Sequence, residues 1–203
     1  MGTLIWSVLW FLSLPLAAGG GPLGIDSRLA KDDHGIWGRS SQTRLTEVVL
    51  VTEVVGALVG GGQTRIGRTF WQAMDATALS AITVETARPL FSRSRPRLTE
   101  SPNQWFQGHG HGSFPSGEVA LQASFVTPFI LEYHHDHPWV WALAALPAYD
   151  AIARVKVRGH WQTDVLAGAA IGCAWGMYAH RRSSPFILGV LPDGFTAGLR
   201  ITF

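Results

Sequence analysis

Cysteine and lysine are scarce in this chain of 203 residues, which has one cysteine, Cys173, and two lysines, Lys31 and Lys156. A single thiol cannot form an internal disulfide, and it excludes a metal site built from several cysteines. Almost all of the positive charge therefore sits on arginine, whose planar guanidinium group binds phosphate or carboxylate through several donors. The net charge of +2 gives no compositional sign of nucleic-acid binding, and we expect no nucleic-acid partner.

Long charge-free helices are also missing. The apolar stretches between charged residues in the expected helices cover 119–131, 138–149 and 165–179, and each is shorter than the roughly 20 residues that a membrane span needs. Hydrophobic residues make up 47% of the chain, which is enough for a core in a length that fits one domain. These features favour a water-soluble helical bundle. The alternative is a compact membrane protein with short or tilted spans.

The N-terminus carries a charge-free apolar run over residues 4–18, and small residues lie at its end. This length and ending are typical of a signal peptide, so we predict a leader over 1–19 and export of the protein. No Lys or Arg precedes the run, which leaves a retained hydrophobic anchor or a buried N-terminal helix as alternatives. A lone cysteine suits an oxidising compartment.

Hydrophobic periodicity predicts one all-α domain over 44–203, preceded by a loose, Gly-rich segment over 20–43. The first helix begins near residue 44 and ends at the glycine run 60–62, and a loop rich in Pro and Gly covers 91–115. The remaining helices are expected over 69–90, 116–133, 138–155 and 162–181. The last residues, about 185–203, place two apolar runs around Pro192-Asp193-Gly194 and predict a short C-terminal β-hairpin packed on the bundle.

Two segments carry groups that suit an anionic ligand. Arg88 and Arg95, with Arg93 between them, concentrate positive charge where a helix runs into a loop. Ser116 and Gly117 open a helix, and we expect their backbone N–H groups to be free to bind an anion. Taken alone, each segment is better explained as a solvated helix end or a plain helix cap.

A third segment contains a candidate nucleophile. His160 and Asp164 are four residues apart, so they share one face of a helix, and Arg154 lies shortly before them. An Asp that accepts a hydrogen bond from one imidazole nitrogen leaves the lone pair of the other nitrogen free to attack.

In this order the three segments resemble the motifs of the type 2 phosphatidic acid phosphatase superfamily, which includes bacterial acid phosphatases, lipid phosphatases and vanadium haloperoxidases. The family pattern is Lys-x6-Arg-Pro, then Pro-Ser-Gly-His, then Ser-Arg-x5-His-x3-Asp. It corresponds here to residues 88–96, 115–118 and 153–164. Three positions depart from the pattern, because Arg88 replaces Lys, Glu118 replaces His and Ala153 replaces Ser.

The resemblance implies a helical bundle of the acid phosphatase/vanadium haloperoxidase type and a phosphoryl transfer through a phosphohistidine, with neither metal nor other cofactor. His160 would be the nucleophile and Asp164 would hold its imidazole. Glu118 occupies the position of the general acid, and His111 is an alternative proton source. The residues expected to bind the phosphate are Arg88, Arg95, Ser116, Gly117 and Arg154.

The implied substrate is a phosphorylated small molecule or a lipid phosphate. With the predicted leader, we expect the protein in the bacterial periplasm or cell envelope, where contact with a membrane surface is possible. A membrane-bound form would favour phosphatidic acid, phosphatidylglycerol phosphate or undecaprenyl pyrophosphate. The departures at Glu118 and Ala153 leave open a non-catalytic phospholipid-binding or envelope interaction protein, and a vanadium haloperoxidase is a further alternative within the fold. Two His-rich segments, 107–112 and 134–137, read either as polar loops or as metal ligands. The sequence makes no prediction of oligomeric state.

Overall fold

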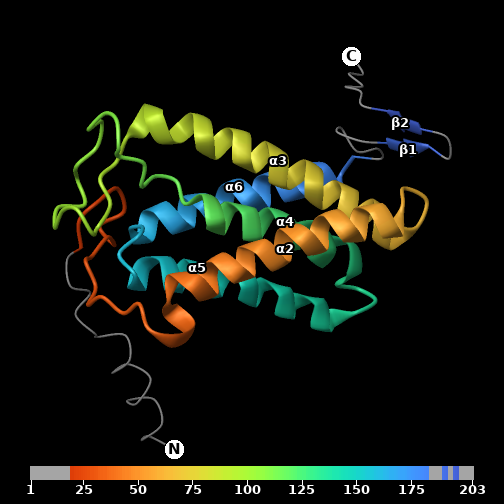
Figure 1. Cartoon of the computed structure of the whole chain (residues 1–203), viewed down its shortest axis with the longest axis horizontal. Coiled ribbons are helices and arrows are strands. Elements are labelled where there is room, and N and C mark those ends of the chain that lie inside the picture. The colour runs from red at the N-terminus through yellow and green to blue at the C-terminus, as the bar shows by residue number, and fades with distance from the viewer. Residues whose placement is uncertain (1–18, 183–188, 192–193, 197–203) are drawn as a thin grey trace, which may run out of the picture.

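The computed structural model of the protein describes residues 19–182, 189–191 and 194–196 (Figure 1). Its long helices lie roughly side by side, which confirms the all-α fold. They are α2 (Arg39–Gly60), α3 (Arg65–Phe91), α4 (Gly117–Tyr133), α5 (Ala145–Lys156) and α6 (Gln162–His180). The 3-10 helices η2 (Gly35–Trp37) and η3 (Pro138–Ala144) precede α2 and α5, and the short strands β1 (Gly189–Leu191) and β2 (Gly194–Thr196) pair antiparallel.

Helix α4 is the centre of the bundle, because nearly all of its side chains from Val119 to Ile130 are buried. A helix that is apolar all round has no face to offer to water and packs inside. Its closest neighbour is α6, which turns a row of glycines toward it. A Cβ atom at Gly172 would lie 2.2 Å from the carbonyl oxygen of Ala120, so the two backbones approach as closely as they do only because this side chain is absent.

The core combines an aromatic cluster with buried polar side chains, some of which form a link between helices. Phe70, Phe125 and Phe129 stack edge to face or tilted, with ring centroids 4.8–6.4 Å apart. Beside them, the Thr77 hydroxyl donates to the buried Glu53 carboxyl at 2.8 Å and lies 3.1 Å from the Ser124 hydroxyl. This chain of hydrogen bonds joins α2, α3 and α4.

Two predicted boundaries differ from the structure. The helix expected from residue 44 begins at Arg39, and the segment before it, expected to be loose, is bound to the bundle through the fully buried Asp26. The single helix expected over 138–155 is divided into η3 and α5. The predicted leader lies almost wholly outside the described residues, as does most of the predicted hairpin, and both stay predictions. Within the described part of the chain, no helix has the length and apolarity that a membrane span requires.

Candidate active site

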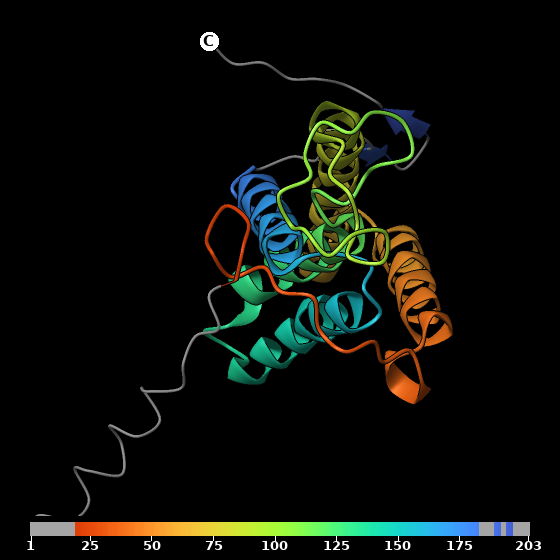
Figure 2. The ribbon, with the colours of Figure 1, turned by 90° about the vertical axis from the view of Figure 1, so that its left-hand side faces the viewer.

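All three motifs meet at one end of the bundle, where five segments come together (Figure 1). The C-terminus of α3, the loop 92–115, the N-terminus of α4, the C-terminus of α5 and the N-terminus of α6 lie on the same side. Figure 2 views this end directly and shows the loop and the N-terminal segment lying across the helix ends. Residues far apart in the sequence are thereby brought to one site.

His160 is buried just before α6, with 2% of its surface exposed. Its Nδ1 lies 2.6 Å from the carbonyl oxygen of Ser113 and 3.7 Å from Oδ2 of Asp164. A carbonyl oxygen can only accept, so Nδ1 carries the proton and the lone pair is on Nε2. Burial lowers the pKa of His160 to about 4, against the opposing effect of Asp164. The imidazole is therefore neutral near pH 7, with Nε2 ready to act as a nucleophile.

Asp164 does not hold the imidazole by a direct hydrogen bond, which differs from the expected pairing. Its carboxylate accepts hydrogen bonds from the Ser113 hydroxyl, the Arg93 guanidinium and the backbone N–H of Trp161. Burial works to raise the pKa of Asp164, but His160 and Arg93 outweigh it and hold the pKa below its usual value. The charged Asp164 thus fixes Ser113, and the Ser113 carbonyl in turn fixes His160.

Arg93 is the main residue that the sequence analysis left without a role. It is completely buried and forms ion pairs with both Asp26 and Asp164, each at 2.5 Å. Asp26 also accepts hydrogen bonds from the backbone N–H and the hydroxyl of Thr163. The N-terminal segment is thereby tied to the start of α6. Arg93 lies within the span of the first motif and Thr163 within that of the third, but both stand at positions that the pattern leaves open, and Asp26 lies outside every motif.

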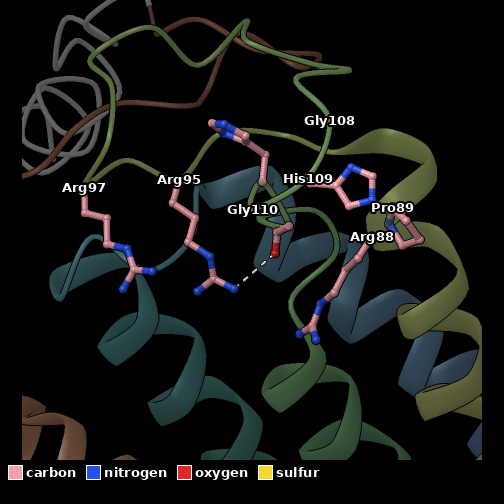
Figure 3. Close-up of a pocket in the computed structure, with 9 residues that line it drawn as sticks. Arg88, Pro89, Arg95, Arg97, Gly108, His109 and Gly110 are labelled. Carbon is pink, nitrogen blue, oxygen red and sulfur yellow. Dashed lines mark hydrogen bonds between the residues drawn. The ribbon is translucent and has the colours of Figure 1, made fainter.

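Arg88 and Arg95 line a cavity of about 490 Å³ together with Arg97, His109 and His111. Figure 3 shows Arg95 between Arg88 and Arg97, with the three guanidinium groups pointing toward the helix ends beneath them. Burial lowers the pKa of Arg95 to about 10, and the charges of Arg154, Arg97 and Arg88 add to the lowering. Neighbouring cations that repel one another in this way favour binding of an anion between them.

Three buried donors at this site have no hydrogen-bond partner among the described residues. They are Nε of Arg88, Nε of Arg154 and the hydroxyl of Ser116. Buried polar groups in proteins are almost always hydrogen-bonded, so unpartnered donors gathered at one place mark a ligand site. The three belong to the three different motifs, and all were predicted to bind phosphate.

The start of α4 differs from expectation in one respect. The backbone N–H of Ser116 donates to the carbonyl oxygen of Asp164 at 3.0 Å, so this group is not free for an anion. Gly117 lies against Arg88, because a Cβ at this position would be 2.5 Å from Nη2 of Arg88. A side chain at 117 would therefore displace the guanidinium of Arg88 from its present place at the helix end.

Glu118 is engaged by arginine. Its carboxylate accepts two hydrogen bonds from Arg39 and lies 3.7 Å from Nη1 of Arg154. Burial works to raise the pKa of Glu118, but the hydrogen bonds from Arg39 and the charges of Arg154 and Arg39 together outweigh burial and keep the pKa below its usual value. Glu118 is thus ionised near neutral pH, whereas a general acid must carry a proton. Arg39, outside every motif, was not predicted.

The two His-rich segments, 107–112 and 134–137, were the candidate metal ligands in the sequence. Within the described residues, no group of three His, Cys, Asp or Glu side chains is arranged to hold a metal ion. Asp136, in the second of these segments, pairs instead with Arg65 at 2.6 Å.

Comparison with known proteins agrees with the motifs. The family model of the PAP2 superfamily matches residues 69–186, which include all three motifs. A lipid A 1-phosphatase of Porphyromonas gingivalis is 33% identical over 101 residues, which are 49% of this chain and 20% of that protein. The chain thus spans about a fifth of the length of this relative. No solved structure matches the chain. Because the family match covers more than half of the sequence, the chain belongs to the PAP2 superfamily, the type 2 phosphatidic acid phosphatases that its motifs resemble.

Proposed function

We propose that this protein is a phosphatase that hydrolyses the phosphate esters of lipids through a phosphohistidine formed on His160, without a metal ion. The observation that carries the proposal is the group of unpartnered buried donors on Arg88, Arg154 and Ser116, beside a neutral buried histidine. A phosphate group would supply acceptors to all three donors and place its phosphorus near Nε2 of His160. The name of the Porphyromonas gingivalis relative supports a lipid phosphate as substrate.

The proposed reaction has two steps. Nε2 of His160 attacks phosphorus while the bond from phosphorus to the leaving oxygen breaks, which gives a phosphohistidine and an alcohol. Water then attacks the phosphohistidine and releases inorganic phosphate and free His160. Negative charge spreads over three oxygens in each transition state, and fixed arginines can stabilise that charge without rearrangement. Arg88, Arg95 and Arg154 are proposed in this role.

Metal independence and the nucleophile are tested together. We expect phosphate release from p-nitrophenyl phosphate to continue in EDTA and to fall at least about a thousand-fold in His160→Ala, as when other catalytic nucleophiles are removed. His135→Ala, which alters an exposed histidine away from the site, is the matched control and keeps the wild-type rate. Phosphate that binds without turnover would support a non-catalytic binding protein instead.

The source of the leaving-group proton is a separate question, because Glu118 is ionised by its pair with Arg39. His111 lines the cavity beside Arg88 and Arg95, and its Nδ1 is 2.8 Å from the Ser94 hydroxyl. We propose His111 as the proton donor toward alkyl phosphates. His111→Gln should then slow hydrolysis of an alkyl phosphate far more than that of p-nitrophenyl phosphate, whose leaving group needs no proton. Equal slowing of both esters would contradict the assignment to His111. The variant Glu118→Gln in the same assay tests the expectation that Glu118 is the general acid.

Contact with a lipid surface is proposed from the exposed side of α2. Between Glu47 and Arg65 the only charged side chain is Glu53, and it is buried. The outer side of the helix presents Val48, Val51, Val55, Leu58 and Val59 to the surroundings. Such an apolar strip suits the boundary of a membrane. We also propose that the apolar run over residues 4–18 directs the protein to the bacterial periplasm or cell envelope.

A further inference from the structure

Arg154 is anchored by a layer of polar side chains that extends beyond the motifs. Gln42 on α2 is fully buried, and its Oε1 accepts a hydrogen bond from Nη1 of Arg154 at 3.0 Å. Nη1 of Arg39 donates to the same oxygen at 3.3 Å, and Arg39 also binds Glu118 on α4. Helices α2, α4 and α5 thus each contribute to this first polar layer, which lies directly beneath the phosphate site.

A second polar layer lies one helical turn deeper in the bundle. Helices α2 and α4 begin at the site end and α5 ends there (Figure 1), so residues four positions deeper along each helix share a face with the first polar layer. These residues are Thr46, Gln122 and Asp150, and the last two are fully buried. Within the described chain, the Thr46 hydroxyl, the amide oxygen and nitrogen of Gln122 and both carboxyl oxygens of Asp150 lack a hydrogen-bond partner. Buried polar atoms are almost always hydrogen-bonded, so this layer is a place for ordered water.

Asp150 is the acidic member of the second polar layer. Burial without a hydrogen-bond donor disfavours the charged form of a carboxyl group. Burial, and then the charge of Glu118, raise the pKa of Asp150 to about 7, and Arg154 and Arg39 oppose the shift without outweighing it. Burial also raises the pKa of the adjacent Tyr149, which stays neutral. Asp150 is therefore neutral below about pH 7 and ionised above it.

Arg154 is the residue through which Asp150 can affect the phosphate site. The two residues lie one turn apart on the buried face of α5, and the charge of Asp150 counteracts the lowering of the Arg154 pKa by burial. The other elements packed against α5 add little to this balance in the described structure. Helix η3 has no ionisable side chain, and at the site end of α6 the carboxylate of Asp164 is paired with Arg93. The charge that Arg154 meets from below is thus set by Asp150.

We propose that Asp150 is a positioning residue of the phosphate site, which acts through Arg154. While it is neutral, Asp150 leaves the Arg154 guanidinium to the bound phosphate. Once ionised, it attracts that guanidinium and repels the anion. The change of state is the loss of one proton from the carboxyl group to water of the second polar layer. This inference rests on the proposed function, in which Arg154 binds the phosphate.

The test measures binding of inorganic sulfate, whose charge is constant between pH 6 and pH 8.5, by titration calorimetry in EDTA. Over this range His160 stays neutral and Arg95 stays charged, because their pKa values are about 4 and about 10. At pH 8.5 Asp150→Asn should bind sulfate about tenfold more tightly than wild type, which corresponds to about one pKa unit of coupling between carboxyl and anion. At pH 6 the two affinities should agree within about twofold.

Kinetics give a second measurement of the same role. With p-nitrophenyl phosphate at pH 8.5, Asp150→Asn should lower KM by a similar factor and change kcat less than about threefold, since Arg154 binds the phosphate before and during the reaction. Glu53→Gln is the matched control, because it removes another buried carboxyl whose pKa is raised to about 7 but which is hydrogen-bonded to Thr77. It should follow wild type at both pH values.

The outcomes separate this role from the proposed function. Weaker sulfate binding by Asp150→Asn at both pH values would show a merely structural role and overturn the inference. Equal affinity of Asp150→Asn and wild type at pH 8.5, or the same gain in Glu53→Gln, would overturn it too, as would a wild type that binds no sulfate. If sulfate binds as expected but wild type releases no phosphate from the ester, the phosphatase fails while the role of Asp150 at an anion site stands.

Discussion

His160 is surrounded so that its imidazole stays neutral well into the acid range. The folded pKa is about 4, below the usual value near 6.5, because burial disfavours the charged ring. Its nucleophilic form is therefore present above pH 4 and is lost as the pH falls through that value. We expect the acid limb of the pH profile of kcat/KM to lie between about pH 4 and 5, measured with p-nitrophenyl phosphate. An inflection near pH 6.5 that belongs to His160 would contradict this environment.

Arg93 is the other residue whose surroundings decide its role, since its charge is buried between Asp26 and Asp164. Removing one partner of a buried ion pair leaves a charge only partly compensated, which costs about 3 kcal/mol. Asp26→Ala should lower the free energy of unfolding by this amount in urea titrations. It should also lower kcat, because Arg93, the ion-pair partner of Asp164, would no longer be held in place by Asp26. Asp33→Ala, which breaks an exposed pair with Lys31, is the control and should change stability little.

Among the elements, the contact of α4 with α6 depends on small residues. Gly168, Gly172 and Gly176 all face α4, and a Cβ at any of them would lie 2.2–2.5 Å from an α4 atom or from the residue that caps it. Gly172→Ala should cost about 2–3 kcal/mol of stability despite the better helix propensity of alanine, because the backbone of α4 cannot yield. Thermal unfolding measures this cost. Ala174→Ser, on the exposed side of α6, should have a small effect, and equal losses in both variants would show that α6 is simply intolerant of change.

The elements were predictable where local pattern governs them. The apolar pattern located α3, α4 and α6 to within four residues at each end, because these helices bury apolar side chains within the bundle. It did not separate η3 from α5, since both bury apolar side chains along the same stretch. Nor could it show that the segment around Asp26 is fixed. That segment has no periodic pattern, and partners 67 and 137 residues away hold it in place.

For the candidate site, the sequence predicted which residues take part but not the hydrogen bonds that position them. The family resemblance predicted roles for His160, Asp164 and the arginines, and the fold brings these residues together at one end of the bundle. Spacing could not reveal that the Ser113 backbone, rather than Asp164, holds the imidazole, because a carbonyl group is common to every residue. The ionised state of Glu118 depends on Arg39, which is 79 positions away and belongs to no motif.

For the molecule as a whole, the polar link between α2, α3 and α4 makes stability depend on pH. Burial raises the pKa of Glu53 to about 7 from a usual value near 4.5, against the hydrogen bond from Thr77. A carboxyl whose folded pKa is raised stabilises the fold at low pH, and this contribution is lost as the pH rises from about 4.5 to 7. Burial raises the pKa of Asp150 to about 7 as well, which acts in the same direction.

Glu53→Gln isolates the effect of this one carboxyl. Between pH 5 and pH 8 the variant should gain on the order of 2–3 kcal/mol of unfolding free energy relative to wild type, because glutamine keeps an acceptor for Thr77 without ionising. Urea unfolding at the two pH values measures the difference. Glu47→Gln changes an exposed carboxyl on the same helix and should follow wild type at both. A constant difference between Glu53→Gln and wild type would mean that Glu53 is already ionised at pH 5.

The bond between Asp26 and Thr163 spans 137 positions, nearly the whole described chain. A loop of that length closes late, after the shorter-range contacts within the bundle have formed, because its chain entropy must be lost before the contact is gained. A chain synthesised from its N-terminus can therefore pair Asp26 with Arg93 before α6 is made, but the bonds from Thr163 to Asp26 form only once the start of α6 has followed. A fragment that stops short of α6 lacks one of the two carboxylates that compensate Arg93. We therefore expect the proposed phosphatase activity to require α6, and a fragment that ends before it to release no phosphate.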